Sequence, residues 1–99
     1  MSGPRHRLLV CYDVRDPARL RRTHDRMLGY GDPLQYSVFL CELSPAEQVL
    51  MEEALLSVVR VDEDSLAIVD LGPARGIAAR RIRTLGTSMI PARRRYKVV

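Results

Sequence analysis

Apolar residues gather into three short runs that predict strands. Residues 8–14 are almost continuously apolar, as is typical of a central strand covered on both faces. Residues 33–43 are rich in β-branched and aromatic side chains, which favours one bent strand or two short ones. A third apolar run covers residues 65–71. The chain is therefore predicted to contain three or four core strands.

Two segments between these runs carry helix start signals. Asp16-Pro17 supplies a side-chain cap, followed by a residue whose missing N–H costs nothing in the first turn. This first helix is expected to end at Gly29 and Gly31, which allow a turn. Residues 44–47 have the sequence SPAE, a capping box with Pro at the first helical position. We expect the second helix to continue from there to about Val59.

The order of these elements predicts the fold class. Strand, helix, extended segment, helix and strand together fit an α+β fold, a ferredoxin-like βαββαβ sandwich with both helices on one face of an open sheet. A further short strand at about residues 80–86 has no obvious place in one compact sheet, so we expect a homodimer in which this C-terminal strand docks on the partner sheet. We therefore treat residues 1–99 as a single domain, with a core of about 7–72 and a basic tail at 87–99.

Bulk composition is that of a small globular protein. At 99 residues with 46% hydrophobic residues, the chain suits one domain that dimerisation would help to stabilise. No apolar run approaches the roughly 18 residues of a membrane span, and MSGPRHR leads into a strand rather than a signal-peptide core. We therefore expect a cytoplasmic protein without a membrane partner. Cys11 and Cys41 are isolated, and we expect them to be small buried apolar residues.

The charge of the chain is unevenly distributed. Residues 27–70 contain nine acids and one base, whereas residues 5–26 hold seven arginines. Residues 71–99 hold eight basic residues and no acid. This asymmetry favours a polyanionic partner, with nucleic acid the obvious one. The alternative is a basic solvated face that aids solubility.

Arginines of the first helix are expected to form a stripe. At 100° per residue, Leu20, His24, Met27 and Leu28 share one side of this helix. Nearly the opposite side carries Arg15, Arg19, Arg22 and Arg26, which could contact phosphates there. The candidate nucleic-acid-binding residues are Arg15, Arg19, Arg21, Arg22 and Arg26.

Asp13 is the candidate catalytic carboxylate. It follows the first apolar run, at the strand end where ligands usually gather in open α/β-type sheets. The alternative is a structural carboxylate that accepts bonds from the N–H groups of the next turn. One Asp alone is a weak signal for Mg²⁺, which usually binds more than one carboxylate. In a two-fold dimer, however, two copies of Asp13 could hold a hard cation that lowers the pKa of a bound water and stabilises charge on a phosphodiester.

The segments CYDV, YGDPLQYSVFLCELSPAE and EDSLAIVDLG, with the arginine-rich helix between the first two, resemble the CRISPR-associated protein two family. The resemblance covers residues 8–72, with weaker similarity through RIRTLG. It implies a ferredoxin-like homodimer with the C-terminal strand docked on the partner's sheet. It also implies a Mg²⁺-dependent endonuclease of RNA or double-stranded DNA that takes part in spacer acquisition and antiviral defence. The implied partner is the CRISPR-associated integrase, protein one.

The resemblance also implies roles for single residues. Asp13 matches the family's metal-binding aspartate, and Tyr12 belongs to the same Y-D motif. Ser37 and Phe39 match the QYSVF stretch, so the candidate catalytic set is Asp13, Tyr12, Ser37 and Phe39. This chain departs from many relatives at Asp32-Pro33, where they carry a basic residue, which leaves the choice between RNA and DNA open.

Other interpretations of the same residues remain. Phe39 also suits a core or dimer-interface position, and Ser37 lacks a His base partner in the sequence pattern, so we do not interpret it as a nucleophile. Two other functions are possible for the whole chain. The first is a non-catalytic DNA-binding bridge between integrase dimers, and the second is a ribonuclease toxin of the VapD-like type.

Overall fold

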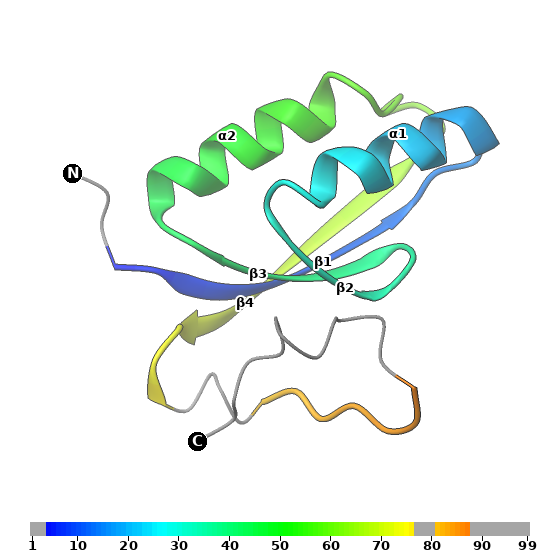
Figure 1. The fold of residues 1–99 in the computed structure, drawn as a ribbon. Helices are drawn as coiled ribbons and strands as arrows, with labels where there is room; N and C mark the ends of the chain where they lie inside the picture. Colours follow the sequence, from blue (N-terminus) through cyan, green and yellow to red (C-terminus); the bar gives the residue numbers. More distant parts are fainter. Residues whose placement is uncertain (1–3, 77–80, 88–99) are drawn as a thin grey trace.

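The structure is a computed structural model that describes residues 4–76 and 81–87. Its elements, in chain order, are β1 (His6–Asp13), α1 (Pro17–Met27), β2 (Gly31–Gln35), β3 (Val38–Leu43), α2 (Pro45–Leu56) and β4 (Ser65–Pro73). The predicted βαββαβ order is confirmed, and the extended segment proves to be two short strands joined by a turn (Figure 1). No helix of the described residues is long and apolar enough to span a membrane.

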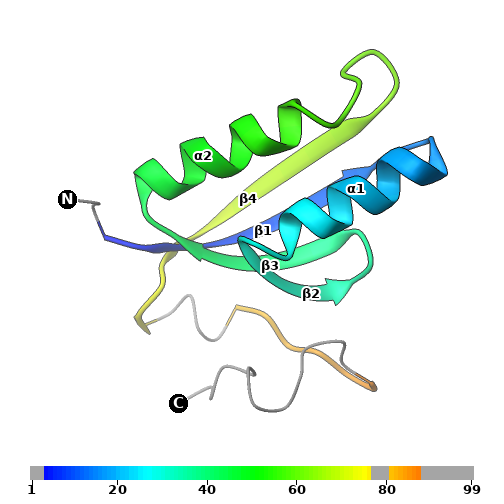
Figure 2. The same ribbon diagram turned by 45° about the horizontal axis from the view of Figure 1, so that its top comes forward.

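The four strands form one antiparallel sheet in the order β2-β3-β1-β4. Helices α1 and α2 lie side by side on one face of this sheet (Figures 1 and 2). The described segment 81–87, drawn in orange, runs below the opposite face, which we call the open face. Strand β1 is central because it pairs with both β3 and β4, so its end lies between two neighbours.

The core fills the layer between the sheet and the helices. Because strand side chains alternate between faces, Leu8, Val10 and Tyr12 of β1 point toward the helices. They pack there against fully or almost fully buried residues of the other elements: Met27, Phe39, Cys41, Leu43, Met51 and Leu55. The next residue after Tyr12 therefore points the other way, and Asp13 belongs to the open face.

Both predicted helix starts are confirmed. The Asp16 side chain accepts a hydrogen bond from the N–H of Arg19 at 2.9 Å. In α2, the Ser44 hydroxyl accepts from the Glu47 N–H at 3.2 Å, and the Glu47 carboxylate accepts from the Ser44 N–H at 2.9 Å. The ends differ slightly from the prediction, because α2 stops at Leu56 and continues only as a turn toward Val59.

The prediction of buried cysteines is confirmed for Cys41 but not for Cys11, which lines the pocket beside Asp13. Cys11 is half-buried and Cys41 is fully buried, and neither forms a disulfide. Burial, followed by the nearby charge of Asp32, raises the pKa of the Cys41 thiol to about 12. Cys41 therefore packs as a neutral apolar side chain.

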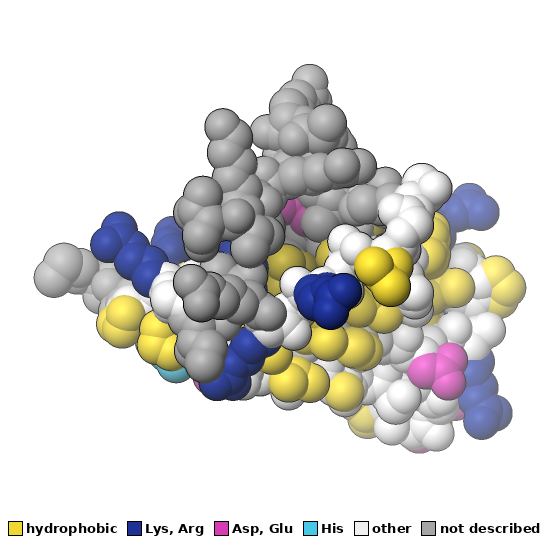
Figure 3. Space-filling model, turned by 90° about the horizontal axis from the view of Figure 1, so that it is seen from below, with side chains coloured by type: hydrophobic (Ala, Val, Ile, Leu, Met, Phe, Trp, Pro, Cys, Tyr) yellow, Lys and Arg dark blue, Asp and Glu magenta, His cyan; other side chains and the backbone are white. Residues whose placement is uncertain are grey.

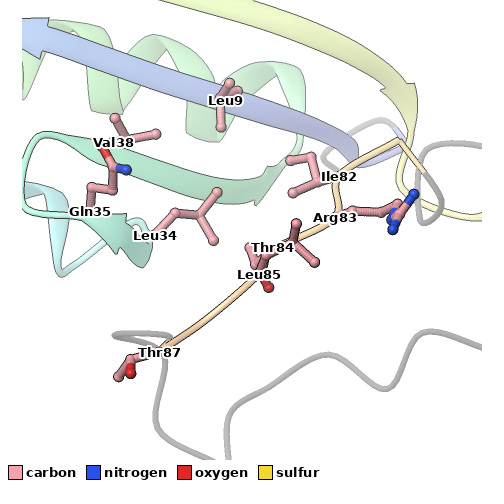
Figure 4. Close-up of a pocket in the computed structure, with 9 residues that line it drawn as sticks. All are labelled: Leu9, Leu34, Gln35, Val38, Ile82, Arg83, Thr84, Leu85 and Thr87. Carbon is pink, nitrogen blue, oxygen red and sulfur yellow. The ribbon is translucent and has the colours of Figure 1, made fainter.

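The predicted C-terminal strand at 80–86 lies partly outside the described residues, as does most of the tail at 87–99. Over residues 81–87 the single chain forms no strand. Instead, Ile82 and Leu85 border a groove of about 410 Å³ on the open face (Figure 4). Its other wall is built by Leu9 of β1, Leu34 of β2 and Val38 of β3. Docking on a partner's sheet stays a prediction.

Candidate functional site at the end of β1

Asp13 is the last residue of β1, and its side chain is exposed on the open face. It stands opposite Ser65, the first residue of β4. Ser37, in the turn between β2 and β3, lines the same pocket of about 290 Å³. The carboxylate and two serines therefore share one end of the sheet, over a floor that includes Cys11 and Ala67. Ser65 carries no signal of its own in the sequence, because only the register of β1 with β4 places it opposite Asp13.

The hydrogen bonds do not support the alternative that Asp13 is a structural carboxylate bonded to N–H groups of the next turn. Within the described parts of the chain, no group donates a hydrogen bond to the Asp13 carboxylate. The N–H of Arg15, in the turn after β1, donates instead to Asp64 at 3.0 Å. The carboxylate is therefore available for a ligand.

The pocket suits a hard cation only in part. Its polar side chains offer one carboxylate, from Asp13, and the hydroxyls of Ser37 and Ser65, all of which are oxygen donors of the kind Mg²⁺ prefers. Over residues 4–76 and 81–87, no three His, Cys, Asp or Glu side chains come together as a ligand set. The donor chemistry fits a hard cation if a second carboxylate comes from another copy of the chain.

Tyr12 anchors the turn that carries Ser37. Its hydroxyl donates to the carbonyl of Tyr36 at 2.8 Å, and its N–H donates to the carbonyl of Ser37 at 3.1 Å. Burial, then the nearby Tyr36 and Asp25, holds the pKa of the Tyr12 phenol well above its usual range. Tyr12 therefore stays protonated and positions the β2–β3 turn beside Asp13.

Ser37 and Phe39 have different positions. Ser37 is half-buried at the pocket, and neither described histidine contacts its hydroxyl, in keeping with the sequence interpretation that it is not a nucleophile. Phe39 is 0% exposed and packs beneath Tyr12, with ring centroids 6.3 Å apart. In this structure Phe39 supports the site from the core and does not face a ligand, which agrees with the alternative interpretation of this residue.

Arg19 departs from the expected stripe. It is buried, because the loop before β4 reaches over it: its Nε donates to Asp64 at 2.8 Å and its terminal nitrogen to the other Asp64 oxygen at 3.0 Å. Glu63 lies 3.3 Å from the same guanidinium. The buried face of α1 runs through Arg19, Thr23 and Met27, so it lies nearer to Arg19 than the sequence predicted. The acidic turn at residues 61–64 (VDED) covers Arg19 there. Arg19 therefore joins α1 to the loop, a role that sequence analysis missed although VDED was a visible signal.

The other arginines divide into two groups. Arg26 reaches across to α2, where it donates to the Ser57 hydroxyl at 3.1 Å. Arg15, Arg21 and Arg22 are exposed, and in the described part of the chain none of their guanidinium groups forms an ion pair. Leu28, expected on the apolar side, is 43% exposed at the C-terminal cap of α1. The exposed side of α1 therefore combines arginines with the apolar side chain of Leu28.

Figure 3 views the molecule from the open face, where hydrophobic side chains lie between arginine side chains. The register accounts for the apolar part, because Leu9 pairs with Leu40 on one side and Val69 on the other. Val69 is 45% exposed there. A hydrophobic face bordered by basic groups adjoins the Asp13 pocket.

Comparisons with known proteins agree on one family. The family model described as CRISPR associated protein Cas2 matches residues 6–75. The CRISPR-associated endoribonuclease Cas2 of Geobacter sulfurreducens is 36% identical over 94 residues, which cover 95% of this chain and 98% of that protein. The CRISPR-associated endoribonuclease Cas2 1 of Rhodospirillum rubrum is 37% identical over 76 residues, or 77% of this chain and 74% of that protein.

Solved structures give the same result. The crystal structure of Streptococcus pyogenes Cas2 at pH 6.5 matches with a TM-score of 0.67 and 35% identity, over 81% of this chain and 99% of that one. Another Cas2 crystal structure matches with a TM-score of 0.69 and 30% identity, over 88% of this chain and 93% of that one.

Proposed function

Because the chain belongs to the Cas2 family of CRISPR-associated proteins, we propose that it is a Mg²⁺-dependent endonuclease of RNA or double-stranded DNA that takes part in spacer acquisition and antiviral defence. The observation that carries this proposal is Asp13, an exposed carboxylate at the end of the central strand that accepts no internal hydrogen bond among the described residues. Relatives named endoribonucleases support phosphodiester hydrolysis as the reaction.

A homodimer would complete the site. The apolar open face, with Leu9 and Val69 paired across β1 and β4, is a surface that a second copy can cover. A two-fold axis near the end of β1 would bring two Asp13 carboxylates together, which supplies the acidic ligands that one chain lacks. The C-terminal segment would then leave its own groove and dock on the partner's sheet.

The dimer proposal predicts a simple change of mass. Val69→Asp places a charge on the open face, whereas Leu50→Asp places one on α2, where Leu50 is 58% exposed on the opposite side of the molecule. We expect light scattering after size exclusion to give the mass of one 11.2 kDa chain for Val69→Asp and of two chains for wild type and Leu50→Asp. A Val69→Asp protein that remains dimeric would place the interface elsewhere.

The chain's own residues would each contribute one step. Asp13 of each subunit would hold the cation, which when bound lowers the pKa of a water and neutralises charge on the phosphate. Tyr12 keeps the β2–β3 turn, and with it Ser37, in place beside the carboxylate. The exposed guanidinium groups of Arg21 and Arg22 would bind phosphates of the same substrate.

Two arginines should account for part of the salt dependence of binding. We expect replacing Arg21 and Arg22 together by Gln to weaken nucleic-acid binding and to lower the slope of log K against log salt by about 2 for duplex DNA. Arg60→Gln is the matched control, because Arg60 is an exposed arginine already paired with Asp62 and Glu63. Fluorescence anisotropy across a salt series measures both quantities. An unchanged slope would mean that this side of α1 is only a solvated face.

The exposed arginines also support a second function, a non-catalytic bridge that holds DNA while the CRISPR-associated integrase performs the chemistry. One assay distinguishes the nuclease from the non-catalytic bridge. Labelled RNA and duplex DNA are incubated with the purified protein in Mg²⁺ or in EDTA, and binding is measured in parallel. Cleavage only in Mg²⁺ supports the nuclease, whereas duplex binding without cleavage, together with co-purification of the integrase, supports the bridge.

A further inference from the structure

His24 and Tyr36 form a stacked pair at the rim of the helix-covered side. Their ring centroids lie 4.0 Å apart and their planes differ by 5°. His24 is half-buried on α1, while Tyr36, in the turn between β2 and β3, is 43% exposed. A tyrosine with one face covered and that much exposure presents its other face to solvent.

Contacts with the Tyr36 carbonyl and with Phe39 hold the stack in place. His24 Nδ1 lies 2.8 Å from the carbonyl oxygen of Tyr36, and because a carbonyl can only accept, Nδ1 carries the proton and donates. The edge of the same imidazole packs against Phe39, with centroids 5.2 Å apart at 63°. The Tyr12 hydroxyl donates to the same carbonyl at 2.8 Å. The backbone of Tyr36 is therefore anchored by two hydrogen bonds, and its ring is placed by the stack on His24.

A fixed aromatic ring with one free face is what a nucleobase needs for stacking. Every base has a π face, so such a contact tolerates any sequence, but a base within a duplex is already stacked on both sides. The pair adjoins the proposed active site, because the residue after Tyr36 is Ser37, which lines the Asp13 pocket. The side chain of Asp13 is on the open face and the stack is on the helix side, so a dimer formed through the open face leaves the stack accessible.

We propose that the His24–Tyr36 stack is a platform for one unpaired nucleobase; this rests on the proposed action on nucleic acid and specifies its substrate. Arg21 lies one turn before His24 on α1 and is exposed, so it can reach the phosphate of the stacked nucleotide. Asp25, four residues after Arg21, is exposed on the same side of α1 and offsets part of this positive charge, so Arg21 supports the contact less than the ring does.

The test compares three oligonucleotides of one sequence by fluorescence anisotropy: single-stranded RNA, single-stranded DNA and duplex DNA. We expect Tyr36→Leu to weaken single-strand binding by roughly tenfold without changing its salt slope, because stacking releases no counterions. Tyr36→Phe keeps the ring and should bind within about twofold of wild type. Duplex affinity should be unchanged in both variants. The two single-strand arms show whether the 2′-hydroxyl matters.

A single strand of the same length without any bases provides the second measurement, because a platform that accepts any base can shift past one abasic position. Wild type should bind this fully abasic strand about tenfold more weakly than the strand with bases, and Tyr36→Leu should bind the two about equally. The abasic arm uses wild-type protein alone, so it decides the matter even if Tyr36→Leu does not fold.

The outcomes separate the two proposals. If Tyr36→Leu folds and matches wild type on single strands, or if wild type binds the fully abasic strand as tightly as the strand with bases, the platform is wrong while the nuclease proposal stands. A folded Tyr36→Leu that loses duplex and single-strand binding equally would also overturn it. If wild type binds neither single strands nor duplex, the proposed function itself fails.

Discussion

Asp13→Asn should abolish Mg²⁺-dependent cleavage while nucleic-acid binding stays intact. The amide keeps the size of the carboxylate but removes its charge, and in a dimer it does so at both ligand positions. We expect the cleavage rate to fall by on the order of 100-fold or more, because the cation that stabilises the developing phosphate charge is no longer held. The measurement is a time course on labelled RNA and duplex DNA in Mg²⁺, with anisotropy for binding.

Asp62→Asn is the matched control, because Asp62 is an exposed carboxylate on the loop before β4 and does not line the Asp13 pocket. It should cleave at the wild-type rate. A mixed dimer of one wild-type and one Asp13→Asn chain, isolated with two different tags, tests whether both carboxylates are needed. If they are, the mixed dimer should be nearly as inactive as the variant. If Asp13→Asn cleaves at the wild-type rate, Asp13 does not hold the catalytic cation.

Asp64→Ala should strongly destabilise the fold, because it removes the buried ion pair that joins the loop before β4 to α1. The Asp64 side chain is 0% exposed and binds Arg19 through both oxygens, at 2.8 and 3.0 Å. It also accepts from the N–H groups of Arg15 at 3.0 Å and Arg60 at 2.9 Å. Its removal leaves the buried guanidinium with only the more distant Glu63 among the described residues, and two N–H groups without their acceptor. We therefore expect the Tm to fall by on the order of 10 °C.

Glu63→Ala is the control for that loss. Glu63 contacts the same guanidinium from 3.3 Å, but its side chain is 42% exposed, so its removal should change the Tm only slightly. Replacing Arg19 by Met in the Asp64→Leu background should recover part of the loss, because no charge is then left buried. A Tm within a few degrees of wild type for Asp64→Ala would show that the loop does not depend on this ion pair.

The same ion pair should make stability depend on acidity. The Arg19 guanidinium, followed in effect by the backbone N–H groups of Arg60 and Arg15, holds the pKa of Asp64 well below its ordinary value of 3.8. Since the folded pKa is lower than the unfolded one, the stabilisation is fully present above about pH 4 and is lost as the pH falls toward the folded pKa. When the pH falls below about 4, the free energy of unfolding should therefore decrease less for Asp64→Ala than for wild type.

The elements themselves were predictable because their signals are local. The cap at Asp16 and the capping box at Ser44 and Glu47 each act within four residues, so the structure only had to confirm them. The apolar run ending at Asp13 likewise predicted a central strand with a polar end, and β1 is that strand. The sequence by itself thus determined the order of elements and the position of the candidate carboxylate along the chain.

What surrounds each residue was decided only by the tertiary structure. Helical periodicity predicts the direction of Arg19 around the axis of α1. It does not predict that an acidic loop 45 residues away buries the side chain. Ser65 lies opposite Asp13, and Tyr36 stacks on His24, because strands and helix distant in sequence meet at one end of the sheet. Burial and pairing depend on these distant neighbours, whereas caps and periodicity depend on adjacent residues, and this is why the sequence located the carboxylate while the fold supplied its surroundings.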